Sequence, residues 1–234
     1  MNLIQNNQIN YFVYFYNVIF HFNLWWLLYI SLNNQSIISL KDLPANKIIE
    51  AKTRIINSIQ ACMLVILSGL HLSNLISYEN WFYGIMISPA FGLFDLIVVT
   101  LDYKNFKKGY KSILLHHMIL MFGPLCITEQ NAFIICRLYF FEFTVPILDY
   151  NWYLYYTKKG NTLLFKIVSL CSVFSYFVFR IMNNLFIFTY FFTEDGFSGI
   201  NYYITFIVAI LFMGLNLTWF SALVNMFIKK IKII

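Results

Sequence analysis

Charged residues are scarce in this chain of 234 residues: only 11% are Asp, Glu, Lys or Arg, whereas 60% are hydrophobic. A soluble domain carries about 25% charged and about 45–50% apolar residues. The chain therefore cannot cover the surface of a water-soluble globule with polar groups. This excludes a soluble enzyme, a nucleic-acid-binding module and a disordered protein, although the formal net charge is +6.

Cysteine motifs and long polar linkers are also missing. The four cysteines show neither a CxxC pair nor the spacing of a metal site, and all fall in apolar stretches. We therefore expect them to be buried as small hydrophobic residues. No connection is long enough to hold a soluble domain. Residues 1–10 contain no basic residue and precede a long apolar run, so we expect no cleaved signal peptide.

What the chain does contain is a series of long apolar stretches. An α-helix needs about 20 such residues to cross a bilayer. The predicted fold is therefore all-α, a multi-pass transmembrane helical bundle with about seven spans. The stretches are Tyr11–Ser31, Ile55–Leu75, Trp81–Leu101, Ser112–Thr128, Phe133–Tyr155, Leu163–Phe192 and Tyr202–Ile228.

Basic residues mark one side of this bundle. Apart from Arg137 and Arg180, every Lys and Arg lies in or beside the connections after the first, third and fifth stretches, or in the C-terminal tail. The alternate connections contain acidic residues and no Lys or Arg. Because cytoplasmic loops carry the excess of basic residues, this predicts an N-terminus outside the cytosol and a cytosolic C-terminus. The positive charge therefore needs no nucleic-acid partner.

Several ionisable residues fall inside the spans. Each costs about 2.5 kcal/mol or more at the bilayer centre, so we expect them to face the bundle interior. The predicted topology puts most of them in the cytosolic half, which indicates a polar cavity opening to the cytosol. Pro146 should bend the fifth span near this cavity. The residues are Asp95, His116, His117, Glu142, Asp149 and Arg180, with Arg137 as a further buried base.

Simpler structural interpretations exist for three of these residues. Arg180 and Glu142 could form only a buried ion pair that locks two helices together. Asp95 could cap a helix or pair with a lysine whose side chain reaches the interface.

The histidines of the fourth stretch are adjacent, so they point about 100° apart on a helix. One of His116 and His117 can serve as a general base in the cavity, while the other bonds to a neighbouring helix. A metal site of both with Asp95 is disfavoured, because metal-binding pairs are spaced i, i+3 or i, i+4. We expect His21 and His71 to be structural.

The order of these polar residues resembles the TLC family, named for TRAM, Lag and CLN proteins. The resemblance covers Lys52 to Phe227, and the basic segment KTRIINSIQA is similar to the start of the family's second helix. The segments that carry it are FGLFDLIVV with Asp95, SILLHHMIL with His116 and His117, FEFTVPILDYNW ending at Trp152, FVFRI with Arg180, and NLTWF with Asn216 and Trp219.

The family contains ceramide synthases, which acylate a sphingoid base from acyl-CoA, and smaller TLC-domain proteins linked to membrane phospholipid composition. The synthases carry a His-Asp-x-x-Asp cluster after their histidine pair. Here that stretch has Glu142, Thr144 and Pro146 in an E-x-T-x-P pattern, followed by Trp152, which resembles the smaller branch.

The resemblance implies a protein that binds, senses or moves acyl lipids, with Asn216 and Trp219 added to the residues of the cavity. One alternative is an acyl-CoA-dependent N-acyltransferase that uses His116 or His117, with acyl-CoA as co-substrate. A second alternative is a non-catalytic helper of translocation or trafficking. Membrane lipids are the expected partners, and no metal or other cofactor is expected.

The chain divides into three parts by these arguments. Residues 1–51 hold the first span and a basic cytosolic loop, residues 52–228 the TLC-like transmembrane domain, and residues 229–234 a basic cytosolic tail. Lys230 and Lys232 lie fifth and third from the end, which resembles a dilysine retrieval signal and predicts residence in the endoplasmic reticulum. Alternatively, these lysines only anchor the last helix at the head groups.

Overall fold

The computed structural model describes residues 11–32, 40–102, 110–193 and 200–231, and every regular element in these ranges is helical. The all-α prediction is therefore confirmed. Part of the predicted topology lies outside the described residues, namely Lys104, Lys107, Lys108, Glu194, Asp195 and Lys232.

Five helical stretches among the described residues are long and apolar enough to cross a membrane. They are Ala45–Leu72, Tyr78–Leu101, Glu129–Tyr156, Leu163–Thr193 and Tyr202–Ile228, and a shorter apolar helix covers Ile113–Cys126. The first predicted span does form a helix, α1 (Tyr11–Ser31), although Asn17, His21 and Asn23 dilute its apolar character. Seven spans require α1 and the shorter helix to cross as well, so that number stays a prediction.

The remaining helices follow the other predicted stretches in order. They are α2 (Ile48–Leu72), α3 (Tyr78–Gly84), α4 (Ile87–Leu101), α6 (Tyr110–Phe122), α7 (Ala132–Tyr139), α8 (Val145–Tyr156), α9 (Leu163–Tyr176), α10 (Asn183–Thr193) and α11 (Ile200–Ile231).

Two of the predicted spans are interrupted, and a proline explains each interruption. A proline ring clashes with the carbonyl four residues earlier and cannot donate a backbone hydrogen bond. Pro89 lies four residues after Ile85, where α3 ends and the turn to α4 begins. Pro146 follows a 3₁₀ turn, η5 (Phe140–Thr144), that separates α7 from α8. The bend expected at Pro146 is therefore this 3₁₀ turn.

The sixth span contains a different irregularity, a π-helical turn called η6 (Phe177–Met182) between α9 and α10. A π turn inserts one extra residue into an α-helix, and such turns are frequent at functional sites. Arg180 lies within this turn and is buried.

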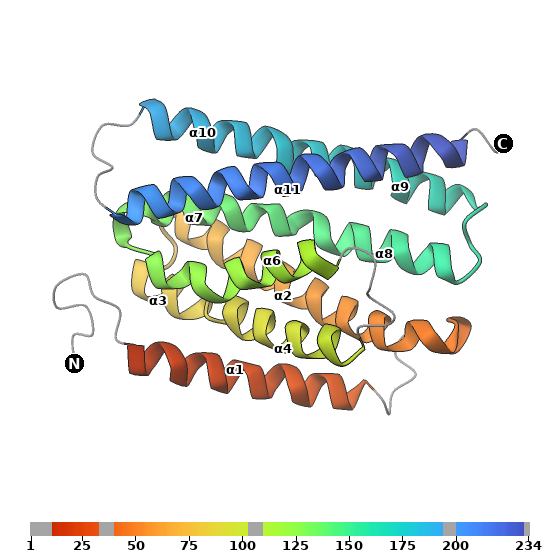
Figure 1. The fold of residues 1–234 in the computed structure, drawn as a ribbon, viewed down its shortest axis with the longest axis horizontal. Helices are drawn as coiled ribbons and strands as arrows, with labels where there is room; N and C mark the ends of the chain where they lie inside the picture. The colour runs from red at the N-terminus through yellow and green to blue at the C-terminus, as the bar shows by residue number, and fades with distance from the viewer. Residues whose placement is uncertain (1–10, 33–39, 103–109, 194–199, 232–234) are drawn as a thin grey trace.

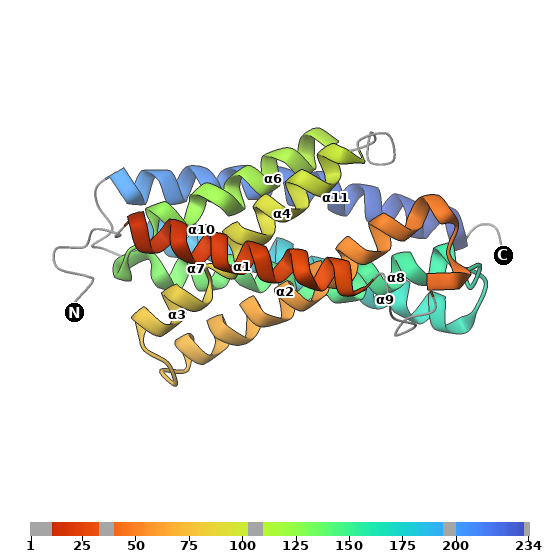
Figure 2. The same ribbon diagram turned by 90° about the horizontal axis from the view of Figure 1, so that it is seen from below.

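The helices run along the long axis of the molecule, with α1 on one side and α10 and α11 on the other (Figures 1 and 2). The start of α2, the end of α8, the start of α9 and the end of α11 lie together at one end, on the right in Figure 1. We call this the basic end, because Lys47, Lys52, Arg54 and the 158–166 lysines belong to it. The α2–α3 turn and the end of α10 lie at the opposite end.

Helix α2 begins at Ile48, about two turns before the predicted start at Ile55. Glu50 and Arg54 are therefore helical neighbours one turn apart, with 2.9 Å between Nη2 and Oε1. The apolar stretch alone leaves Arg54 in the connection after the first span, whereas it lies in α2, as the resemblance of KTRIINSIQA to the start of a helix implies.

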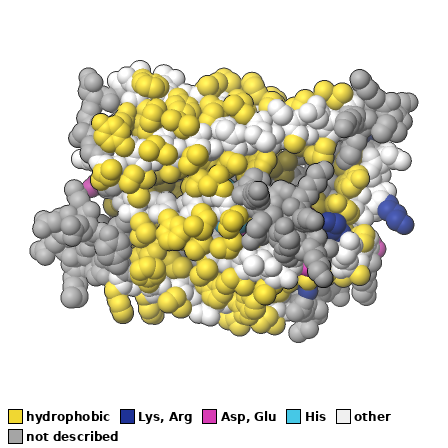
Figure 3. Space-filling model, viewed as in Figure 1, with side chains coloured by type: hydrophobic (Ala, Val, Ile, Leu, Met, Phe, Trp, Pro, Cys, Tyr) yellow, Lys and Arg dark blue, Asp and Glu magenta, His cyan; other side chains and the backbone are white. Residues whose placement is uncertain are grey.

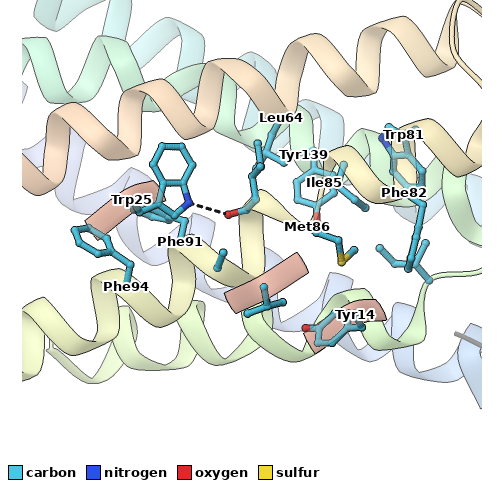
Figure 4. Close-up of a cluster of buried hydrophobic side chains, with 14 of the residues drawn as sticks. Tyr14, Trp25, Leu64, Trp81, Phe82, Ile85, Met86, Phe91, Phe94 and Tyr139 are labelled. Carbon is cyan, nitrogen blue, oxygen red and sulfur yellow. Dashed lines mark hydrogen bonds between the residues drawn. The ribbon is translucent and has the colours of Figure 1, made fainter. Parts of the chain in front are cut away.

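Aromatic side chains form the largest buried cluster, between α1, α2, α3, α4 and α7 (Figure 4). Trp81 is completely buried and belongs to this cluster with Leu64 and Ile85. The indole Nε1 of Trp25 donates to the Ile87 carbonyl at 3.3 Å, and the hydroxyl of Tyr14 donates to the Met121 carbonyl. These contacts fix α1 to the rest of the bundle. We call this cluster the aromatic core.

Hydrophobic side chains also cover the outer surface, and the visible Lys and Arg side chains gather toward the basic end (Figure 3). Cys62 and Cys171 are among the exposed residues, whereas Cys136 is buried. The prediction that all four cysteines are buried is therefore wrong. The reason is that a small apolar residue is as compatible with lipid chains as with a protein interior.

Candidate functional site

A cavity of about 390 Å³ opens between α2, α4, α6, α8, α11 and the α9–η6 helix. It is lined by Asp95, His116, His117, Glu142, Asp149, Arg180 and Trp219. The candidate residues of the sequence that do not line it are Asn216, which is completely buried, and Arg137, whose guanidinium lies over the Phe133 and Phe186 rings. The structure therefore brings residues from five separate spans to one place. We call this space the polar cavity.

His117 and Asp95 form the first contact of the polar cavity. The Nε2 atom of His117 lies 2.7 Å from Oδ2 of Asp95, and both side chains are largely removed from solvent. Gly92 allows this approach of α6 to α4: a Cβ atom there would lie 3.3 Å from the His117 carbonyl oxygen and 3.1 Å from Met121. Asp95 is thus paired with a histidine, and its predicted alternatives of a cap or a lysine partner are not what the structure contains.

His116 lines the same cavity in a different environment. Its ring lies edge-on to Phe212 and Trp219, at centroid distances of 5.7 Å and 5.8 Å. Its Nδ1 atom is buried and has no hydrogen-bond partner among the described residues. Both histidines therefore reach the polar cavity, His117 with a carboxylate partner and His116 without one.

Arg180 is held by neutral groups. Its Nε atom donates to Thr144 Oγ1 at 2.8 Å and to the Phe141 carbonyl at 3.1 Å. Its Nη1 atom donates to Asn216 Oδ1 at 3.4 Å, and the guanidinium lies over the Tyr176 ring.

Glu142 and Arg180 both line the cavity, but no nitrogen of Arg180 comes within 4.0 Å of a Glu142 oxygen in the described structure. The buried ion pair considered for them is therefore absent. The 3₁₀ turn η5 presents both Thr144 and the Phe141 carbonyl to Arg180, so the backbone before Pro146 supplies the contacts that the pair would have made. The Glu142 carboxylate is left facing the cavity.

Asp149 lies at the basic end of the cavity in a network that the sequence did not reveal. It accepts from Arg54 Nη1 at 2.6 Å and from Ser58 Oγ at 2.9 Å. Arg54 also donates to Glu50, which accepts from Lys47 at 2.7 Å. The i, i+4 spacing of Glu50 and Arg54 is the sequence signal for this network, and it requires the helix to begin before the apolar stretch.

A second, smaller cavity of about 60 Å³ continues beyond Glu142 and Arg180, which line both spaces. Its other walls are mostly apolar, with Leu120, Leu138 and Phe212 among them. The combined space is polar toward the basic end and apolar toward the opposite end. Such a division matches an amphiphile with a polar head and a hydrocarbon tail.

The other two histidines contact residues of the first three helices. His21 Nδ1 lies 2.8 Å from the Asn17 carbonyl oxygen, and His71 stacks on Trp81 at 5.0 Å. Neither lines the polar cavity. Within the described ranges, no group of three or more His, Cys, Asp or Glu residues could hold a metal ion.

Comparison with known proteins gives one match. A family model, described as the TLC domain, matches residues 10–225, which include α1 as well as the segments that carried the resemblance. Neither the curated proteins nor the solved structures contain a match. The match extends over most of the chain, and the apolar helices agree with it. The chain therefore belongs to the TLC domain family, as an integral membrane protein linked to lipid handling or metabolism.

Proposed function

We propose that this protein binds one membrane lipid at a time, with the lipid head group in the polar cavity, and thereby senses or moves acyl lipids. The observation that carries the proposal is the polar cavity itself. Ligand cavities usually measure about 300–1,000 Å³ and are mainly apolar with a few convergent polar groups. The polar cavity holds acidic, basic and imidazole groups and continues into an apolar space, as a lipid requires.

The test is to fill the polar cavity and measure the lipid that copurifies with the protein. Ala222 lines the cavity from α11, and Leu217 faces outward on the same helix. Ala222→Phe should reduce bound lipid, measured by mass spectrometry of the purified protein, whereas Leu217→Phe should leave it unchanged. Equal retention by both variants would contradict the proposal, and wild-type protein free of ordered lipid would favour a trafficking helper instead.

A second candidate function is acyl-CoA-dependent N-acyl transfer, favoured by the unpartnered Nδ1 of His116 beside the His117–Asp95 contact. A neutral imidazole in that position can take a proton from an amine. Replacing both histidines by Ala should then lower transfer by about 10²–10⁴-fold, the usual contribution of a general base. A loss below about tenfold argues against this role.

The place of the chain within its family is also part of the proposal. We assign it to the smaller TLC-domain proteins and not to the ceramide synthases. The E-x-T-x-P pattern supports this assignment. A ceramide synthase would carry its second histidine and its aspartates in this stretch, whereas here Thr144 and the turn before Pro146 hold Arg180. Ceramide formation by the purified protein, from a sphingoid base and acyl-CoA, would contradict the assignment.

The proposed orientation has seven spans, with Met1 outside the cytosol and the basic end in it. The segregation of basic residues supports it. A tag on Met1 should be labelled without access to the cytosol, and a tag after Ile234 only with such access. The reverse pattern contradicts the orientation.

We further propose residence in the endoplasmic reticulum, supported by Lys230 and Lys232, the latter outside the described residues. A coat protein reads a dilysine signal by its distance from the terminus. Adding two alanines after Ile234 keeps the charge but moves the lysines. The extended protein should leave the endoplasmic reticulum, and retention there means that the lysines are only anchors.

A further inference from the structure

A second large cavity lies outside the polar cavity, in the surface between α2 and α8. It is a groove of about 390 Å³, and its described lining is almost entirely apolar. Ala51, Ile55 and Ile59 contribute from α2, and Pro146 and Trp152 from α8. We call it the outer groove. It lies within two stretches that are apolar enough to cross a membrane, so hydrocarbon is the medium that meets it.

The outer groove and the polar cavity share two residues, Arg54 and Asp149. The ion pair between them, with 2.6 Å from Nη1 to Oδ1, therefore stands between the two spaces. Ser58 lines the groove side and donates to the other carboxylate oxygen of Asp149 at 2.9 Å. These side chains lie where the lipid-facing groove and the polar interior meet.

One end of the groove fits the interface region of the membrane. The groove runs along α8 from Pro146 in its first turn, and Tyr150, Trp152 and Tyr153 line its other end. Trp and Tyr are enriched at the level of lipid head groups, because their rings are amphipathic. A lipid docked here has its head group level with Arg54 and its chains in the groove.

Each partner of the Arg54–Asp149 contact keeps another contact when the pair opens. Arg54 retains Glu50, to which Nε and Nη2 both donate, at 3.1 Å and 2.9 Å. Asp149 retains Ser58. The Arg54 side chain is 33% exposed and stacks on Trp152 at 4.7 Å, so its guanidinium has room to move along the groove wall. On opening, Arg54 stays paired with Glu50, whereas the buried Asp149 keeps only a neutral hydroxyl, so the cost of opening falls on Asp149.

We propose that the outer groove binds a bilayer lipid by its acyl chain, and that this lipid reaches the polar cavity sideways, past the Arg54–Asp149 pair. The proposal rests on the proposed function, since it names the route to the same cavity. The occupant is a lipid of the leaflet at the basic end. A peptide is a poor occupant, because its backbone polar groups would find almost no partners in the apolar lining.

The test measures how fast bound lipid exchanges. Purified full-length protein, with its copurified lipid, is mixed with vesicles of ¹³C-labelled total lipid from the expression host. Replacement of unlabelled by labelled lipid is followed by mass spectrometry. Ile59→Trp fills the outer groove without touching the polar cavity, because Ile59 lines only the groove and is 40% exposed. Ile66→Trp is the matched control, seven residues later on α2 and 60% exposed.

Ile59→Trp should slow exchange about tenfold, equivalent to about 1.4 kcal/mol in the barrier, with the final amount of bound lipid unchanged. Ser58→Ala removes the contact that Asp149 keeps when the pair opens, so it should also slow exchange. Equal exchange rates for the two Trp variants, or a lower final occupancy at an unchanged rate, overturn the lateral route while leaving the proposed function intact. Wild-type protein without bound lipid overturns both.

Discussion

The aromatic core and the polar cavity lie in the same bundle but are built by opposite rules. In the aromatic core, rings from α1, α3 and α4 fill the space, and polar atoms are limited to contacts such as Trp25 with the Ile87 carbonyl. In the polar cavity, charged groups surround space that the side chains leave unfilled. Within a bilayer, helix association depends on close packing and not on exclusion of water. The residues of the aromatic core therefore hold the bundle together, whereas the residues of the polar cavity are available to a ligand.

The largest expected effect comes from breaking the aromatic core. Trp81→Ala removes a completely buried indole, its 3.5 Å contact with Ser68 Oγ and its stacking with His71. We expect the free energy of unfolding to fall by about 3–5 kcal/mol. Unfolding in detergent micelles measures it. The protein that remains folded should bind the same lipids as wild type.

Leu75→Ala is the control for that variant, because Leu75 is exposed at the same end of α2. Its effect should stay within about 0.5 kcal/mol. A changed lipid profile in Trp81→Ala would show that the aromatic core and the polar cavity are coupled, which contradicts their separate roles.

A second, smaller effect is expected in the polar cavity, where a substitution should change lipid binding and leave the free energy of unfolding almost unchanged. Asp95→Asn keeps the volume but removes the negative charge beside His117. Lipid retention should fall about tenfold, or about 1.4 kcal/mol, with little change in unfolding. Glu79→Gln, an exposed carboxylate at the far end, should retain lipid normally. A large loss of stability with full lipid retention would assign Asp95 to structure.

The smallest effect is expected at Thr144, which positions a residue of the polar cavity and also contributes to stability. Thr144→Val removes one of the two acceptors of Arg180 Nε but leaves the Phe141 carbonyl. We expect a loss of about 1 kcal/mol in the free energy of unfolding, the net value of one hydrogen bond. Thr189→Val loses only a bond to the backbone of its own helix and serves as the control. If the two variants unfold alike, Thr144 does not position Arg180.

Much of the polar cavity could be predicted because lipid penalises every unpaired charge. His117, Glu142 and Arg180 had to face inward, and the structure puts them around one space. Apolar stretches likewise located the helices, since α1 has the predicted ends. The aromatic residues of the core gave no such signal, because a ring facing lipid costs as little as a ring facing protein.

The Arg54–Asp149 contact could not be predicted for another reason. The charge of Arg54 favours the membrane interface, but a charge pattern gives no partner for it. The contact depends on where α2 begins and on the 3₁₀ turn that sets the direction of α8, and neither is encoded in the apolar pattern. The absent ion pair of Arg180 with Glu142 has the same origin, since η5 supplied competing acceptors.

The π turn at Phe177–Met182 has a consequence for how this helix tolerates change in length. Each residue of an α-helix turns the chain by about 100°, so removing the extra residue would rotate α10 by that angle relative to α9. Asn184, which is completely buried, and Ile187 would swing out of the interior toward lipid, while Ser172 and Tyr176 stayed in place. The turn thus lets one continuous helix present two faces that a regular helix could not both bury. Deleting a single residue here would therefore change which side chains the whole second half of the span presents to the protein interior and to lipid.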